Sequence, residues 1–450
     1  MKKFMILALA AIAGVSAAAQ DLTPQMRANI NQLIDKRYKS DEPGGTVVIA
    51  RNGKILYQRG FGMARLEQPT PMQPDMIFSI GSQTKQFTAV CALQLVEQGK
   101  LRVADKISRY IDKCPTSWQD ITIENLLTHS SGISDVRGNN LSITDRIDTA
   151  KTRPLAYKPG TKVFYANIEF DLLGFILEKI SGESIAVNIK KRIIEPLGLK
   201  NTYAPDHNMQ IPGLVSCYIR GRDSSFYINN PNPIAVPVTG AGGLYSNTQD
   251  IAAWYEGLTN GKVIKKETLA KAWQPFILAD GKASKYGYGW DAGGMVQGSP
   301  IAEHGGLSGG FCTDALYLIK EHIYVGVFLN QRTYADATAQ ELAAITLGKP
   351  YPDEIVNAMT IGEIQACAGV YKDSGGAEKR FNLVNGQLYY VPGGGALRSR
   401  FAFYDKDKFY LDNTLVEGEV VRDAQGKVTA VKLQDKRFPA QPQLTWTKTI

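Results

Sequence analysis

The sequence predicts an α+β fold: an antiparallel sheet flanked by helices, with an inserted helical region, followed by a small antiparallel β-barrel. Strand-like patterns occur near the start of the chain and again after about residue 286, and the stretch between them reads as helices and turns. Beyond about residue 360, short alternating strands recur around turn signals. A chain of 450 residues is long enough for two or three units with cores of their own.

Charge and histidine content exclude several classes of protein. The formal charge is +8, but lysines and arginines are spread along the chain and form no basic cluster for a nucleic acid. The four histidines lack the spacing of metal ligands. We therefore expect no metal, no cofactor and no nucleic-acid partner, and the sequence leaves the oligomeric state open.

The N-terminus reads as a signal peptide over residues 1–19. Lys2 and Lys3 precede a short apolar run from Phe4 to Val15, and small residues follow. This run is too short for a lasting membrane anchor, and no later stretch is long and apolar enough to span a bilayer. We therefore expect a periplasmic or secreted protein with no stable membrane anchor. Its five scattered cysteines are expected to be small buried side chains, and one disulfide stays open.

The first hundred residues predict a helix, a β-hairpin and a second helix. The first helix is expected over residues 23–38. Two β-rich runs, 46–50 and 55–57, flank Asn52-Gly53, which is a strong signal for a hairpin turn. Over residues 82–98, apolar side chains recur at helical spacing.

Strand-like patterns return late in this unit. We expect a strand at 286–290, a hairpin from 315–319 and 323–329, and a helix at 335–346. Early and late strands around a helical middle predict one sheet that is built from both ends of a unit spanning residues 23–348.

The C-terminal part of the chain reads as all-β. Residues 349–352 look like a linker, and a small antiparallel barrel is expected over residues 358–450. Its short strands alternate around turn signals at 380–384, 388–391, 409–411, 416–422, 428–433 and 444–447.

The most informative motif is Ser82-Gln83-Thr84-Lys85. Residues three apart share one face of a helix, so the Lys85 amine can lie beside the Ser82 hydroxyl. A lysine can take the serine proton if burial or another cation lowers its pKa. The motif alone is weak, because a helix cap followed by a solvated lysine has the same pattern.

A second motif is Tyr165-Ala166-Asn167, which precedes an apolar helix. A tyrosine at the start of a helix can exchange protons with a nucleophile if nearby cations lower its pKa. Asn167 offers an amide to a substrate carbonyl. Tyr227-Ile228-Asn229 has the same pattern, so the tripeptide is not specific, and its surroundings favour Tyr165.

A third motif is His304-Gly305-Gly306-Leu307, on or beside a strand. Two glycines allow a substrate to lie against the backbone, and the next N–H can donate to an oxyanion. A glycine-rich turn with an exposed histidine is the alternative interpretation.

Together and in this order, the three motifs resemble the serine β-lactamase and penicillin-binding protein superfamily. The resemblance runs from about residue 25 to 345 and is strongest to the class C β-lactamase-like serine peptidases, including D-aminopeptidases and D-Ala-D-Ala carboxypeptidases. Stretches typical of this group are 126–133, 195–199 and 241–246. The resemblance implies a β-lactamase-like fold, followed here by a barrel of lipocalin-like type.

The resemblance also implies roles for particular residues. Ser82 would be the nucleophile that forms an acyl-enzyme, and Lys85 and Tyr165 would transfer protons. The substrate-binding residues would be Asn167, His304, Gly305, Gly306 and Leu307. The backbone N–H groups of Ser82 and Leu307 would form the oxyanion hole, and His129 is expected to be structural.

The sequence departs from the family pattern because it has no Lys-Thr-Gly or Lys-Ser-Gly motif. A neutral His304 in that place attracts a substrate carboxylate less than lysine does. The leading hypothesis is an exported serine hydrolase that acts on small amides or esters, above all cell-wall peptides containing D-amino acids. The alternatives are a β-lactamase, an esterase, or a penicillin-binding protein that acylates with little turnover.

Overall fold

The structure is a computed structural model that describes residues 21–136, 141–205, 209–221, 225–229, 237–352, 358–390, 399–412, 414–439 and 441–449. The expected signal peptide, residues 1–19, lies outside these ranges. Within them, no helix has both the length and the apolar character needed to cross a bilayer.

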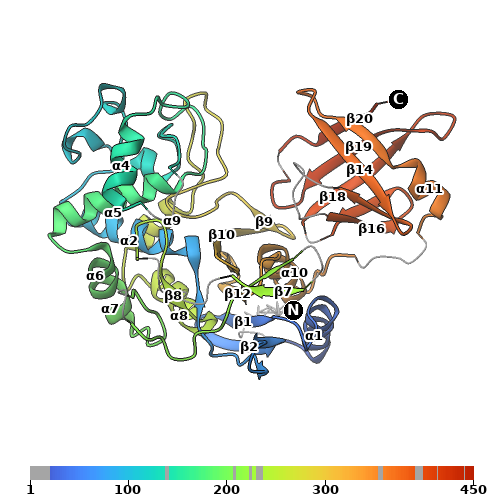
Figure 1. Ribbon diagram of the computed structural model, residues 1–450, viewed down its shortest axis with the longest axis horizontal. Coiled ribbons are helices and arrows are strands. Elements are labelled where there is room, and N and C mark those ends of the chain that lie inside the picture. The colour runs from blue at the N-terminus through green and yellow to red at the C-terminus, as the bar shows by residue number, and fades with distance from the viewer. Residues whose placement is uncertain are drawn as a thin grey trace, which may run out of the picture.

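A six-stranded antiparallel sheet forms the centre of the first part of the chain (Figure 1). Its order, β2-β1-β12-β11-β10-β9, places strands from both ends of the unit side by side, as the sequence predicts. In sheet order the strands are β2 (Lys54–Phe61), β1 (Gly45–Arg51), β12 (Ile323–Leu329), β11 (Phe311–Leu318), β10 (Ser299–Ser308) and β9 (Met295–Val296).

Two hydrophobic cores lie on opposite faces of this sheet. Successive strand residues point to opposite faces, so Val48 of β1 joins the larger core while Val47 and Ile49 join the smaller one. Helices α1 (Pro24–Arg37) and α10 (Ala335–Thr346) supply the smaller core. The larger core includes side chains of α2 (Thr84–Glu97), α3 (Ile123–Leu127), α4 (Ile143–Lys151), α5 (Asn167–Ser181), α6 (Ile185–Ile189), α8 (Thr248–Thr259) and α9 (Lys266–Ala272).

Shorter elements complete the described parts of the chain. The short helical turns are η1 (Gly81–Gln83), η2 (Ile107–Arg109), η3 (Thr116–Trp118), the π-turn η4 (Lys190–Ile194), α7 (Glu195–Leu197) and α11 (Ile361–Ala366). The short strands are β3 (Met63–Arg65), β4 (Thr70–Pro71), β5 (Phe78–Ser79), β6 (Tyr218–Arg220), β7 (Phe226–Ile228) and β8 (Tyr245–Ser246).

The C-terminal part contains a closed barrel of eight antiparallel strands, which confirms the predicted all-β character (Figure 1). The strands are β13 (Gly369–Lys372), β14 (Glu378–Val384), β15 (Gln387–Tyr390), β16 (Ser399–Asp405), β17 (Lys408–Leu411), β18 (Val416–Arg422), β19 (Val428–Asp435) and β20 (Leu444–Lys448). β13 pairs with both β14 and β20 and so closes the barrel. Its interior is strongly aromatic, with the rings of Phe381 and Phe401 4.8 Å apart.

Two local predictions are wrong. Residues 286–290 form a turn instead of a strand, since the Gly287 N–H donates to the Trp290 carbonyl at 2.8 Å and Gly289 has φ +86°. All five cysteines are free, and although three are buried, Cys114 and Cys312 are only partly buried.

Candidate active site

The Ser82 hydroxyl lies in the short turn η1, at the entrance to α2. The sequence predicts a regular helix from Ser82, but the first turn is of the tighter 3₁₀ type, in which residues three apart are nearly eclipsed. This turn places Lys85 Nζ 3.1 Å from Ser82 Oγ. The predicted pairing of serine and lysine is therefore present.

The Lys85 side chain is completely buried, and its amine is oriented by two carbonyl oxygens. Asn167 Oδ1 accepts from Nζ at 2.8 Å, and the Ala241 carbonyl accepts at 2.9 Å. Burial lowers the pKa of Lys85 to about 7, although the buried Asp171 carboxylate opposes this shift. A neutral amine has two N–H donors, and both have carbonyl acceptors here, so its lone pair is left for the Ser82 hydroxyl.

Tyr165 stands on the other side of the nucleophile. Its hydroxyl interacts with the Ser82 side chain, and its ring centroid lies 4.8 Å from Lys85 Nζ. The ring is 42% exposed, but desolvation of the hydroxyl raises the pKa of Tyr165 above its ordinary value. From the sequence, proton exchange was expected to depend on a lowered pKa, and that condition is not met. With a raised pKa, Tyr165 favours the neutral phenol, which can donate a proton.

A buried pair of residues supports the Tyr165 ring. The His129 ring lies 4.3 Å from the Tyr165 ring, and His129 Nδ1 lies 2.5 Å from Glu169 Oε2. Burial lowers the pKa of His129 and raises that of Glu169, so both groups favour their neutral forms. Glu169 also accepts from the Ser131 N–H at 3.0 Å. Sequence reasoning missed Glu169, although its place one helical turn from Tyr165 was a usable signal.

His304 faces the same site from β10 but is closed to ligands. Its side chain is 3% exposed, and burial lowers its pKa to about 3, so the ring is neutral. Nδ1 lies 2.6 Å from the Gly305 carbonyl and therefore donates to it. Nε2 lies 2.9 Å from the Tyr286 hydroxyl and accepts from it. Both ring nitrogens are thus occupied, and Tyr286 is a second residue that the sequence argument missed.

Close packing brings β10 against the nucleophile turn. A Cβ on Gly306 would lie 2.0 Å from the Ile80 carbonyl oxygen and 2.5 Å from Thr313 Oγ1. Gly306 is therefore required by its contact with the turn before Ser82. A Cβ on Gly305 would meet nothing closer than 3.6 Å.

The same contact brings the Leu307 nitrogen to the nucleophile turn. A Cβ on Gly81, which has φ +50°, would lie 2.8 Å from the Leu307 nitrogen. The N–H groups of Leu307 and Ser82 thus belong to adjoining backbone segments. The Leu307 side chain is 49% exposed.

The structure brings the predicted site residues from η1, α2, α5 and β10 to one place. Tyr227, the alternative to Tyr165, lies on β7 and is 50% exposed. Within the described ranges, no group of histidine, cysteine and acidic side chains is arranged to hold a metal ion.

Comparison with known proteins identifies the class that this fold and site define. The family model described as Beta-lactamase matches residues 27–348, so the chain belongs to the Beta-lactamase family. It is a serine hydrolase of the β-lactamase and penicillin-binding protein superfamily.

Three similar proteins illustrate the range of this family. Penicillin-binding protein 4* of Bacillus subtilis (strain 168) is 27% identical over 427 residues, covering 87% of this chain and 93% of the relative. D-aminopeptidase of Gluconobacter oxydans (strain 621H) is 25% identical over 406 residues, covering 87% of this chain and 72% of the relative. The solved structure of the octameric penicillin-binding protein homologue from Pyrococcus abyssi matches with a TM-score of 0.66 and 25% identity, covering 94% and 99% of the two chains.

Proposed function

We propose that this protein is an exported hydrolase that forms an acyl-enzyme on small amides or esters, with cell-wall peptides containing D-amino acids as its substrate class. The observation that carries the proposal is the buried Lys85 amine, 3.1 Å from Ser82 Oγ and with a pKa of about 7. Such an amine is substantially unprotonated near neutral pH and can act as a general base.

The proposed acylation assigns one role to each group. Lys85 accepts the Ser82 proton as Oγ attacks the substrate carbonyl carbon. The N–H groups of Ser82 and Leu307 stabilise the oxyanion that forms. When the bond to the leaving group breaks, Tyr165 donates its hydroxyl proton to the departing nitrogen or oxygen, and Lys85 returns a proton to Tyr165. Water then attacks the acyl-enzyme by the reverse sequence and releases the acid.

The remaining predicted residues have supporting roles in this proposal. Asn167 orients the Lys85 amine through Oδ1, and its Nδ2 group donates to no described residue, so it is available for a substrate carbonyl. Gly305 and Gly306 form the backbone along which the substrate lies. His304 fills the place of a cation with a buried neutral ring and so offers the substrate no charge.

Export, substrate class and domain division also belong to the proposal. The names D-aminopeptidase and putative D-alanyl-D-alanine carboxypeptidase among the relatives support a D-amino-acid substrate. Residues 1–19 would be removed on export, residues 23–348 would form the hydrolase domain, and the barrel domain would span residues 358–450.

Intact-mass spectrometry of the protein without residues 1–19 tests the proposal. The probes are D-alanine p-nitroanilide, its L-enantiomer and benzylpenicillin, each with wild type, Ser82→Ala and the control Ser117→Ala, an exposed serine on η3. We expect release of nitroaniline from the D-enantiomer, lost in Ser82→Ala and retained in Ser117→Ala. Turnover that survives Ser82→Ala would exclude the assigned nucleophile. A lasting penicillin adduct without turnover of any amide would favour a penicillin-binding protein, and rapid penicillin hydrolysis would favour a β-lactamase.

A further inference from the structure

On the side of the active site next to His304, none of the described contacts presents a cation to a substrate carboxylate. The His304 ring is neutral and buried, and both of its nitrogens are engaged, by Tyr286 and by the Gly305 carbonyl. The Lys85 amine already contacts three oxygens inside the protein. A negatively charged group that entered here would be desolvated without a partner.

An acidic residue, Asp291, lies on this side of the active site instead, paired with Glu303 of β10. The turn that begins at Tyr286 ends at Asp291, whose N–H donates to the Glu303 carbonyl at 2.8 Å, one residue before His304. Beyond this pair, from His304 to Ser308, no described strand pairs with that edge of β10. Asp291 therefore stands where the edge of the strand becomes free for a substrate.

Asp291 is an exposed residue, and no hydrogen bond or ion pair joins its carboxylate to a described residue. Desolvation still raises the pKa of Asp291 to about 6, so the carboxylate is charged only above about pH 6, and its tests belong at about pH 8. Its charge nevertheless reaches the cleft, because it raises the pKa of both the Tyr165 and the Tyr286 hydroxyls. An accessible carboxylate without a fixed partner remains free to attract a cation from the substrate.

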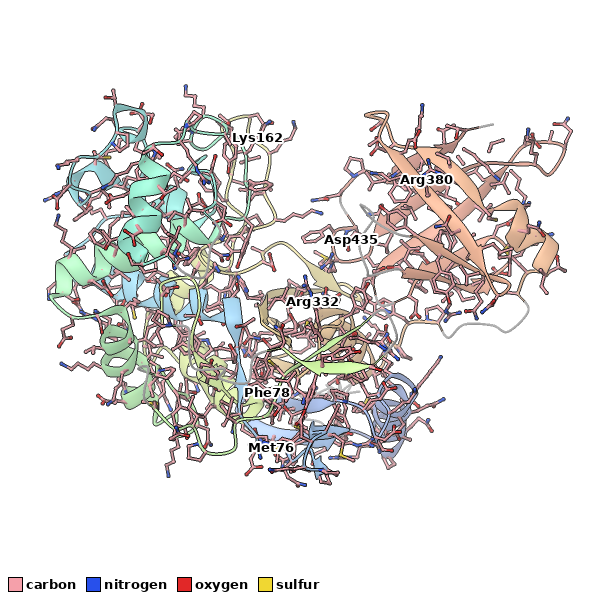
Figure 2. All side chains as sticks on the ribbon, viewed as in Figure 1. Met76, Phe78, Lys162, Arg332, Arg380 and Asp435 are labelled. Atoms are coloured by element: carbon pink, nitrogen blue, oxygen red, sulfur yellow. The ribbon has the colours of Figure 1, made fainter. Side chains whose placement is uncertain are left out.

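The cations near Asp291 have other partners in the barrel. Arg437 Nε and Nη2 donate to the two oxygens of Asp435 at 3.0 and 2.9 Å. The Lys285 amine lies 4.2 Å from the centre of the Phe438 ring. Figure 2 shows Asp435 on the side of the barrel that faces the sheet, and the Arg437 carbonyl accepts from the Met295 N–H of β9 at 2.7 Å. The barrel thus lies next to this side of the active site, but its Arg437 guanidinium is already paired with Asp435.

We propose that the leaving-group side of this cleft selects neutral or cationic leaving groups and disfavours a terminal carboxylate, with Asp291 as the residue that determines this specificity. The inference rests on the proposed function, in which Tyr165 donates its proton to the leaving group. The leaving group must then lie beside Tyr165 and His304, within reach of the Asp291 field. The protein would cleave amides and internal peptide bonds more readily than a bond to a C-terminal amino acid.

Three substrates with one acyl group and leaving groups of similar size test the inference. They are N-acetyl-D-alanyl-glycine, N-acetyl-D-alanyl-glycinamide and the 2-aminoethylamide of N-acetyl-D-alanine, which carry a carboxylate, a neutral amide and an ammonium group. For wild type we expect kcat/KM to be lowest for the carboxylate, by about tenfold against the neutral amide, and highest for the ammonium. The spread should narrow at high salt, because added ions screen charges near the surface.

Two variants separate the role of Asp291 from general effects of charge. Asp291→Asn should bring the three kcat/KM values to within about threefold of one another, mainly through the carboxylate and ammonium substrates. The matched control is Asp336→Asn on α10, which removes an equal charge that also acts on Glu303 but not on Tyr165 or Tyr286. This control should leave the order unchanged.

Each other outcome contradicts a defined part of the inference. A wild-type preference for the carboxylate substrate would overturn it, as would equal rates on all three. If wild type shows the expected order of kcat/KM and Asp291→Asn shows the same order with the same spread, Asp291 does not determine the specificity. If none of the three is cleaved and no D-amino-acid substrate acylates Ser82, the proposed function itself fails and the inference fails with it.

Discussion

The two β-structures of this protein differ sharply in what they bury. The inside of the barrel holds aromatic rings such as Phe381, Phe401 and Trp446. Around β10 and α2, the first unit instead buries ionisable groups, among them Lys85 and Glu303. Burial raises the pKa of Glu303 to about 8. The barrel therefore has a conventional apolar core, whereas the first unit buries ionisable side chains next to its sheet.

This difference shows where chemistry can take place. Burying an ionisable group costs free energy unless partners offset it, and the usual result is a shifted pKa. The barrel does not depend on buried ionisable groups, because its aromatic rings stabilise it through buried apolar area and ring packing. In the first unit the same cost yields a lysine with a pKa of about 7 beside a serine, which is a property that a hydrolase requires.

The largest effect on activity is expected from the glycine that allows β10 to approach the nucleophile turn. Gly306→Ala places a Cβ 2.0 Å from the Ile80 carbonyl oxygen, so the strand must move away and carry the Leu307 N–H with it. We expect a loss of about a hundredfold in kcat/KM, the size of effect seen when an oxyanion donor is removed. Steady-state kinetics on a D-amino-acid amide measures it.

The neighbouring glycine provides the control for this substitution. A Cβ on Gly305 meets its nearest protein atoms at 3.6 Å, so Gly305→Ala leaves the contact of β10 with the nucleophile turn in place and should lose clearly less activity than Gly306→Ala. Circular dichroism and thermal unfolding of both variants check that the fold is kept. Equal losses in the two variants would show that the strand edge, and not the contact at Gly306, is what matters.

The protonation of Lys85 is expected to change kcat/KM about tenfold per pH unit below pH 7. The amine accepts the Ser82 proton only when it is unprotonated, and burial lowers the pKa of Lys85 to about 7. The rate constant kcat/KM should therefore fall about tenfold per pH unit below 7 and level off above it. His304 cannot produce this limb, because burial lowers its pKa to about 3. A flat profile between about pH 5.5 and 7.5, with the fold intact by circular dichroism, would contradict the assignment of Lys85 as base.

The spacing of residues in the sequence predicted the Ser82–Lys85 pair because both lie within one turn. The motifs around Tyr165 and His304 were visible in the sequence, but only the family resemblance joined them to Ser82, and the structure brings them to the same place. The partners of the site residues were less predictable. Tyr286 reaches His304 from a separate turn, and such a contact leaves no local pattern. Glu169 is close to Tyr165 in the sequence, but its partner His129 comes from a distant segment.

The fold shows a similar division between local and non-local information. Strong signals such as Asn52-Gly53 and the apolar runs of β11 and β12 gave correct hairpins. The prediction of a strand at 286–290 was wrong, because alternating aromatic residues and glycines are compatible with a turn as well as with a strand. Strands β13 and β16 were missed: β13 has only four residues and is held by pairing with both β14 and β20, which the local sequence does not reveal, and no turn signal was recognised for β16.

The smallest effect on activity is expected from a change in the barrel. This change tests whether the barrel and the first unit, which have separate cores, are also independent in stability and activity. Phe381→Ala removes a ring that packs 4.4 Å from Tyr371 and 4.8 Å from Phe401, centroid to centroid. Such a truncation should lower the stability of the barrel by about 3–5 kcal/mol while kcat/KM at 25 °C stays within about twofold. Hydrogen exchange of peptides from the barrel at increasing denaturant, alongside kinetics at the same denaturant concentrations, measures both. If activity disappears in step with the barrel signal, the contact of Arg437 with β9 supports the cleft, and the barrel belongs to the catalytic unit after all.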